Sequence, residues 1–174
     1  RKEWGLGFGP ASGDLLANQL KKAGYALQEC QELFLVEKDA SGGYFDRFRS
    51  RLIFPIYDER GRLVAFAGRI IGDGIPKYIN SSDTPLFSKR RTLFGMNLAR
   101  QVMAESGRCV LVEGPLDVIA CHRAGVKEAV ATQGTSLSEE HAALIKRWAN
   151  DVVILYDADK AGQAAADRAE QILT

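Results

Sequence analysis

From residue 108 onward, short apolar segments alternate with segments of helical periodicity, and this alternation constrains the fold more than any other feature. The apolar segments are residues 109–112, 129–132 and 152–156, and the helical ones are residues 115–124, 138–148 and 161–173. Apolar strands separated by helices are typical of parallel β-α-β units whose sheet is covered on both faces. The sequence therefore predicts a parallel α/β sheet for this part of the chain.

Local signals indicate where two of these helices begin. Pro115 suits a first helical position, because the N–H that proline lacks has no partner there in any case. Ser136 and Glu139 have the spacing of a capping box, in which the two side chains satisfy each other's free backbone N–H groups.

Residues 1–107 show a different, mixed pattern. Helical periodicity predicts helices over residues 14–23, 28–34 and 96–106. Ser12 or Asp14 is expected to cap the first of these helices, and Gly107 to end the last. The boundary between the two parts of the chain is expected near Gly107.

The middle of the chain predicts a hairpin followed by a loop. Two apolar, extended runs, residues 51–57 and 62–71, flank the turn sequence Asp58-Glu59-Arg60-Gly61. Residues 72–93 are interrupted by glycine and proline and rich in serine, aspartate and lysine, so we expect little regular structure there.

Composition places the chain among globular proteins: 46% of the residues are hydrophobic and 26% are charged. No apolar run is long enough for a membrane helix, and the N-terminus lacks the pattern of a signal peptide, so no membrane partner is expected. The three cysteines have no CxxC spacing, which favours neither a zinc site nor a disulfide framework. The expected compartment is the cytoplasm.

Charge is distributed unevenly, although the formal net charge is only +1. Residues 47–91 carry ten Lys and Arg against four Asp and Glu, a local net of +6, whereas residues 108–174 carry seven against ten, a local net of −3. A phosphate-rich partner and a metal site would account for this asymmetry. Two solvated faces of opposite sign are the alternative.

Acidic residues follow two of the predicted parallel strands. Glu113 comes directly after the first strand, and Asp157 and Asp159 come directly after the third. Parallel sheets bind ligands beyond the carboxyl ends of their strands, so these carboxylates are expected at one edge, with Asp117 close by in the following helical turn. Their mutual repulsion would be offset by a hard divalent cation such as Mg²⁺. The alternative for Asp159 and Asp117 is a helix-terminal role, and for Glu113 that of an ordinary loop acid.

Arginines occupy alternate positions at Arg47, Arg49 and Arg51. If this stretch is extended, all three lie on one face, where a row of guanidinium groups suits a phosphate backbone or a triphosphate. An exposed strand face carrying charge for solubility is the alternative. Farther along, Lys77, Asn80 and Ser81 offer a cation and hydrogen-bonding groups, and Lys89-Arg90-Arg91 forms a basic cluster.

Three motifs in the last third of the chain together resemble the Toprim domain, a small Rossmann-like metal module of topoisomerases, primases and some nucleases. They are VEGPLD at residues 112–117, QGT at residues 133–135 and DADKAG at residues 157–162. The family pattern is a Glu after the first strand and an Asp-x-Asp after the third. It maps onto Glu113, Asp157 and Asp159.

The whole chain resembles the catalytic core of a DnaG-type bacterial primase, because DRFRSRLIFPI, AFAGR, PKYINSSDTPLFSKRRTLFG, VEGPLDVIA and YDADKAG occur in the family's order. The resemblance implies an α/β fold with a basic mixed α/β N-terminal subdomain over residues 1–107. A Rossmann-like Toprim subdomain with a parallel sheet follows over residues 108–174, truncated at its C-terminal side. In the family, the active site is the cleft between the two.

The resemblance also implies an activity: template-directed synthesis of short RNA primers on single-stranded DNA from ribonucleoside triphosphates. It implies Mg²⁺ or Mn²⁺, with more than one ion, as the cofactor and no zinc in this part of the protein. The implied partners are template, nucleotides and primer. A replicative helicase and a single-strand-binding protein would be bound through other regions.

The site residues implied by the resemblance fall into two groups. The catalytic acids would be Glu113, Asp117, Asp157 and Asp159, of which Glu113, Asp157 and Asp159 would bind metal. The residues that would bind nucleotide or nucleic acid are Arg47, Arg49, Arg69, Lys77, Asn80, Ser81, Lys89, Gly134 and Thr135.

Two other functions stay open on the sequence alone. The family has a further acidic cluster after the next strand, and the sequence ends at Thr174 before it, so the chain is also compatible with a non-catalytic nucleotide- and metal-binding module. A fragment of a Toprim nuclease or topoisomerase is the other alternative. The arginine-rich segment and the PKYINS sequence argue against it.

Overall fold

A computed structural model describes residues 4–174, which divide into two compact units. One unit comprises the chain up to Pro55 together with Val64–Phe87, and the other comprises Ile56–Leu63 and Ser88–Thr174. The second unit thus begins before the predicted boundary at Gly107, since helix α3 (Met96–Ser106) packs against its sheet. No helix among residues 4–174 is long and apolar enough to span a membrane.

The first unit combines short helices with antiparallel strands. Its elements are β1 (Gly7–Gly9), α1 (Leu15–Lys22), α2 (Leu27–Glu32), β2 (Val36–Lys38), β3 (Tyr44–Asp46), β4 (Arg51–Tyr57), β5 (Leu63–Ile70) and β6 (Tyr78–Asn80). Strands β1, β4, β5 and β6 form one sheet in that order, and β2 pairs with β3. The turn of the β4–β5 hairpin belongs to the second unit. The mixed α/β architecture predicted for the N-terminal part is confirmed.

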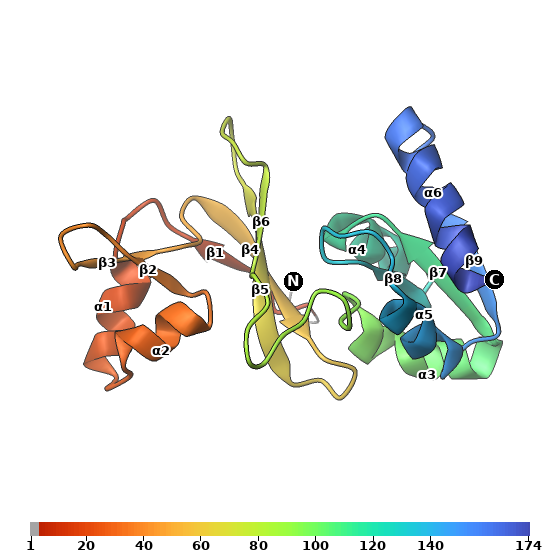
Figure 1. The fold of residues 1–174 in the computed structure, drawn as a ribbon, viewed down its shortest axis with the longest axis horizontal. Coiled ribbons are helices and arrows are strands. Elements are labelled where there is room, and N and C mark those ends of the chain that lie inside the picture. Colours follow the sequence, from red (N-terminus) through yellow and green to blue (C-terminus); the bar gives the residue numbers. More distant parts are fainter. Residues whose placement is uncertain (1–3) are drawn as a thin grey trace. The chain divides into compact units, whose positions relative to one another are not determined.

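The N-terminus of α1 is held by a residue far away in the sequence. Asp46, at the end of β3, is buried, and its carboxylate accepts hydrogen bonds from the backbone N–H groups of Leu16 at 2.8 Å and Ala17 at 2.9 Å. The predicted caps are therefore wrong: the Asp14 side chain makes no capping bond. Figure 1 shows α1 and α2 beside the β2–β3 hairpin that supplies this aspartate.

The second unit contains a parallel three-stranded sheet. Besides α3, its elements are β7 (Arg108–Val112), α4 (Pro115–Arg123), β8 (Ala129–Ala131), α5 (Glu139–Lys146), β9 (Asp151–Leu155) and α6 (Lys160–Leu173). The strands lie in the order β8-β7-β9, with β7 central, and every pairing is parallel. In Figure 1 these elements run from green to blue. The predicted parallel α/β sheet is confirmed.

The core of this unit is formed by side chains from β7 and β8 together with the helices that cover them. Leu111, Val130, Met103 and Ile145 are at most 1% exposed. Strand β9 is less well covered, because Val153 and Leu155 are 46% and 56% exposed while Val152 and Ile154 pack toward the core. The expectation that both sheet faces are covered is therefore wrong at the edge strand β9. Within residues 4–174, one face of this strand is exposed.

Several element predictions differ from the structure in detail. The segment over residues 72–93 has little regular structure, as predicted, and its one strand is the three-residue β6, which pairs with β5. The capping box of α5 consists of Ser138 and His141 instead of Ser136 and Glu139, because the helix begins two residues later than that spacing implied. Pro115 does stand at the first helical position of α4.

Candidate functional site

The strand register brings the ends of all three parallel strands to one edge of the sheet. Val112, the last residue of β7, lies opposite Ala131 of β8 and Leu155 of β9. The next residues along the chain, among them Glu113 and Thr132, therefore emerge together at this edge. This confirms the predicted placement of the acids at the carboxyl ends of the strands.

Glu113 is connected directly to the segment after β9. Its Oε1 accepts a hydrogen bond from the backbone N–H of Asp157 at 2.9 Å. Gly162, near the start of α6, lies so close that a Cβ atom added to it would stand 2.9 Å from the same oxygen and 2.2 Å from the carbonyl oxygen of Asp157. The absence of a side chain at Gly162 thus lets α6 approach the Glu113 carboxylate.

Asp159 and Asp117 both accept hydrogen bonds at helix N-termini. Asp159 caps α6 by accepting from the backbone N–H of Gly162 at 2.8 Å, and Asp117 accepts from the backbone N–H of Gly114 at 3.0 Å. These are the local roles that were the alternatives to metal binding.

A pocket of about 340 Å³ opens at this edge of the sheet. It is lined by Glu113, Thr132, Gly134, Thr135, Ser136, Leu137, Tyr156, Asp159, Ala161, Gly162 and Ala165. Gly134 has a φ of 72°, in the left-handed region, and the Thr132 hydroxyl donates to the carbonyl oxygen of Thr135 at 2.7 Å. The predicted residues Gly134 and Thr135 thus share a pocket with Glu113 and Asp159.

The acids do not gather into a ready-made metal cage. Among residues 4–174, no three His, Cys, Asp or Glu side chains come together as a possible ligand set, so metal binding by these carboxylates stays a prediction. The physical reason is that Asp159 and Asp117 turn back to satisfy helix N-termini. Mg²⁺ is often held by one or two carboxylates and by substrate phosphates, and carboxylates at the ends of β7 and β9 suit an ion bound in that way.

Tyr156 is a pocket residue that the sequence patterns did not single out. Burial, together with the nearby Glu113 charge, raises the pKa of its phenol to about 12. The hydroxyl is therefore protonated at neutral pH and can donate a hydrogen bond. The sequence could have pointed to Tyr156 through its position between the apolar residues of β9 and Asp157. A tyrosine at the end of an apolar run is, however, equally compatible with a core residue.

The arginines of residues 47–51 do not form a row, and that prediction is wrong. Arg47 and Arg49 lie in a turn, where Arg47 stacks on Phe34 at 3.8 Å and pairs with Glu37 at 3.2 Å. Arg51 begins β4 and is 4% exposed. The stretch bends because Ser50 has a φ of 53°, which ends the extended alternation.

The β5–β6 ribbon carries another group of predicted binding residues. Arg69 lies opposite Tyr78 in the register, with its guanidinium 5.9 Å from the centre of the tyrosine ring, and Asn80 lies opposite Ala67. Lys77, just before β6, is exposed. Aromatic and basic side chains on one ribbon suit the bases and phosphates of a nucleic acid.

Ser81 is not among the residues that line the pocket beside Glu113. It is fully buried, and its hydroxyl exchanges hydrogen bonds with the backbone N–H and carbonyl of Phe66 at 3.2 Å and 3.0 Å. The side chain therefore extends the pairing of the ribbon beyond Asn80.

Lys89 lies half-buried before α3. Its neighbour Arg90 pairs with Glu140 of α5 at 3.3 Å, and the Arg90 carbonyl accepts from the Ser138 hydroxyl at 2.7 Å. The basic cluster of residues 89–91 is thus attached to the start of α5, and part of its charge is compensated there.

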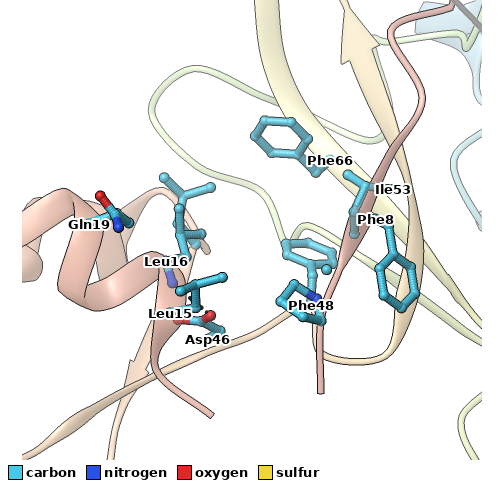
Figure 2. A pocket seen from close by; sticks show the side chains of 11 residues that line it. Phe8, Leu15, Leu16, Gln19, Asp46, Phe48, Ile53 and Phe66 are labelled. Atoms are coloured by element: carbon cyan, nitrogen blue, oxygen red, sulfur yellow. Dashed lines mark hydrogen bonds between the residues drawn. The ribbon is translucent and has the colours of Figure 1, made fainter. Parts of the chain in front are cut away.

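The first unit has a pocket of its own, also of about 340 Å³, with a different character. Figure 2 shows Leu15, Leu16 and Gln19 of α1 facing a wall of Phe8, Phe48, Ile53 and Phe66. Its one carboxylate, that of Asp46, is already bonded to α1. Neither pocket is lined by a lysine or arginine, but Glu113 and Asp159 in the pocket of the second unit could hold phosphates through a divalent cation, so that pocket is the better candidate for a nucleotide.

Two family models match different parts of the chain. Residues 1–100 match the family model described as "DNA primase catalytic core, N-terminal domain", and residues 110–174 match the model described as "Toprim-like". The chain is also 45% identical to a DNA primase of Halalkalibacterium halodurans over 169 residues, which are 97% of the chain and 28% of that protein. A DNA primase of Pseudomonas aeruginosa is 43% identical over 97% of the chain and 26% of its own length.

Solved structures agree with the family matches. A DNA primase domain from Pseudomonas aeruginosa superposes with a TM-score of 0.90 at 41% identity, covering 99% of the chain and 54% of that domain. A DnaG primase catalytic domain bound to ssDNA gives 0.86 at 39% identity, covering 97% and 54%. The chain spans about a quarter of the length of the curated relatives it matches. It belongs to the family of DNA primase catalytic cores.

Proposed function

We propose that the chain is part of a bacterial DNA primase that synthesises short RNA primers on single-stranded DNA from ribonucleoside triphosphates. The observation that carries this proposal is the match of nearly the whole chain to primase catalytic domains, one of them bound to ssDNA. The pocket at the carboxyl edge of a parallel sheet, with acids at two strand ends, supports the same function.

In this proposal the acids serve a divalent metal, Mg²⁺ or Mn²⁺, with more than one ion and no zinc in this part of the protein. Glu113, Asp157 and Asp159 would hold the metal together with nucleotide phosphates, and Asp117 would add to the acidic field. The bound metal would supply charge stabilisation at the reacting phosphate and leaving group. Asp159 would have to serve both the metal and the α6 cap, which its two oxygens allow.

The chain's other residues would orient the substrates. Gly134 and Thr135 would line the nucleotide pocket beside Glu113. Asn80, on the β5–β6 ribbon, would donate or accept a hydrogen bond with nucleotide or nucleic acid. Arg47, Arg49, Arg69, Lys77 and Lys89 would bind phosphates of template and nucleotide. Arginine forms paired hydrogen bonds to a phosphate, whereas lysine acts as a point charge, so the two residue types would contribute differently.

The remaining parts of the proposal concern the whole protein. Residues 1–107 would form a basic subdomain, and residues 108–174 would form a Toprim subdomain. A replicative helicase and a single-strand-binding protein would be bound through other segments, and the enzyme would act in the bacterial cytoplasm at the replication fork.

A primer-synthesis assay tests this function in a full-length primase that carries the chain. With a single-stranded template, ribonucleoside triphosphates and Mg²⁺, the enzyme should make short RNA products, and removal of the metal with a chelator should abolish them. Calorimetric titration with a ribonucleoside triphosphate in the presence and absence of Mn²⁺ should show metal-dependent binding. Binding without synthesis would indicate a non-catalytic module, and nicking of supercoiled DNA without synthesis would indicate a nuclease or topoisomerase.

A further inference from the structure

Arg51 is a buried cation whose hydrogen bonds all go to backbone carbonyls. Its Nη1 donates to the carbonyl oxygens of Gly68 at 3.3 Å and Lys77 at 3.2 Å, and its Nη2 donates to that of Pro76 at 2.9 Å. At 4% exposure, Arg51 offers little surface to a nucleic acid itself. Its role must therefore be exerted through the segment that it holds.

The segment that Arg51 holds has little burial of its own. Residues 71–78 are all exposed, so apolar packing does not fix the path of this loop. One end is fixed at Ile71, whose backbone N–H donates to the Ser50 carbonyl oxygen at 3.1 Å. The other end is fixed at Lys77, whose carbonyl oxygen accepts from the Ile70 backbone N–H at 2.9 Å as well as from Arg51. Arg51 adds a second attachment one residue earlier, at Pro76.

The sheet makes room for this arginine at Gly68. A Cβ atom on Gly68 would lie 3.0 Å from Cδ of Arg51 and 2.8 Å from Cδ1 of Phe48. The glycine thus lets the Arg51 stem pass across β5 to reach the loop. A lysine would lack the planar fork that reaches several carbonyls at once, so Arg51 and lysine are not interchangeable here.

The geometry points to Arg51 as a positioning residue: we infer that it holds Lys77 at the place where the lysine contacts a phosphate of the single-stranded DNA template. This inference rests on the proposed function. Lys77 is adjacent to Tyr78 and near Arg69 on the same ribbon, so a displaced loop would separate the lysine from the other basic and aromatic side chains. Fixing the backbone on both sides of the Pro76–Lys77 bond removes freedom that DNA binding would otherwise have to restrict.

A double-mutant cycle tests the inference in a full-length primase that carries the chain, with a fluorescent oligothymidylate as the probe. Lys77→Ala and Arg51→Lys should each weaken DNA binding about fivefold at low salt and lower the salt slope of log K by about one. The double variant should bind no more weakly than either single variant, because both remove the same phosphate contact. Arg60→Lys, in the exposed hairpin turn, is the matched control and should bind like the parent protein.

The outcomes separate the inference from the function on which it rests. If the parent protein binds oligothymidylate but Arg51→Lys binds equally well, or if the two losses multiply in the double variant, Arg51 does not position Lys77. If the parent protein binds no single-stranded DNA, the proposed function fails first. If Arg51→Lys does not fold, Gly68→Ala replaces it in the cycle, because the added Cβ would displace the Arg51 stem while the charge is retained. Gly68→Ala should lower the affinity for oligothymidylate and the salt slope. Combining it with Lys77→Ala should cause no further loss.

Discussion

The backbone N–H of Asp157 donates a hydrogen bond to Oε1 of Glu113, joining the segment after β9 to the end of β7. One Glu113 oxygen is thus used to hold the edge together, while the other remains available for a ligand. Structural and functional roles of this carboxylate can therefore be separated by substitutions that keep the acceptor oxygen and remove the charge.

Glu113→Gln should abolish primer synthesis while preserving the fold. The amide oxygen of glutamine can still accept from Asp157, so the free energy of unfolding should change by less than about 1 kcal/mol. Loss of the negative charge should reduce synthesis at least about 100-fold, as removal of an electrostatic group at a reacting centre commonly does. Glu105→Gln, on exposed α3 surface, is the control. Full activity of Glu113→Gln would contradict the metal-binding role.

Gly162→Ala should disrupt the same edge sterically. The added Cβ would stand 2.2 Å from the carbonyl oxygen of Asp157, a backbone atom that cannot move aside without displacing β9 or α6. We expect a loss of about 1–3 kcal/mol in stability by chemical denaturation, together with weaker nucleotide binding.

Gly114→Ala is the matched control for that substitution. Gly114 also borders the acids, but its Cβ would meet Asp117 Oδ2 at an ordinary 3.6 Å, and its backbone is extended. It should leave stability nearly unchanged. Equal losses in the two variants would mean that crowding at Gly162 is not the cause.

Asp46→Ala should destabilise the first unit through α1. The carboxylate accepts from two N–H groups at the helix N-terminus, and its removal leaves both without that acceptor. The expected cost is about 1–2 kcal/mol in the free energy of unfolding, as for loss of a helix cap. Asp46→Asn keeps one acceptor oxygen and should lose less, whereas Asp73→Asn in an exposed loop should lose nothing. Stability unchanged by Asp46→Ala would show that α1 does not depend on this contact.

His141 should make the stability of the second unit depend on pH near neutrality. Burial lowers the pKa of this imidazole below its ordinary 6.5, and Nδ1 accepts from the Ser138 backbone N–H at 3.2 Å. The His141 imidazole therefore binds a proton less readily in the folded state than in the unfolded state. Stability should be complete above pH 6.5 and fall as the pH decreases toward the lowered pKa, by at most about 1.4 kcal/mol per pH unit.

His141→Gln is the variant that isolates this effect. Glutamine can supply the capping-box acceptor but does not titrate, so the fall in stability between pH 6.5 and 5 should become shallower. The measurement is the urea midpoint as a function of pH in both proteins. Identical pH profiles would show that another group is responsible.

Elements with strong local signals were predictable from the sequence. The strand Arg51–Tyr57 and the helix Met96–Ser106 have the predicted bounds, because alternating or helical apolar patterns there end at clear turn signals, Asp58 and Gly107. The short strands β1, β2 and β3 gave no such signal. Each is three residues long and is defined by pairing with a distant segment.

The candidate site was predictable in its location and not in its detailed contacts. A parallel sheet necessarily brings Glu113 and Asp157 to one edge, so the sequence alone determined that acids meet there. Whether a carboxylate faces a ligand or a helix N-terminus depends on which N–H groups lie within reach. For Asp159 this was decided by the position of α6.

Arg51 shows most clearly the difference between what the sequence determined and what the tertiary structure decided. The sequence by itself determined the α/β class, the parallel sheet and the basic character of residues 47–91, because these follow from periodicity and composition. It could not determine that one of three alternate arginines is buried under the Pro76–Lys77 backbone. That depends on Gly68 leaving space on a neighbouring strand and on carbonyls 25 and 26 residues away, which only the folded chain brings together.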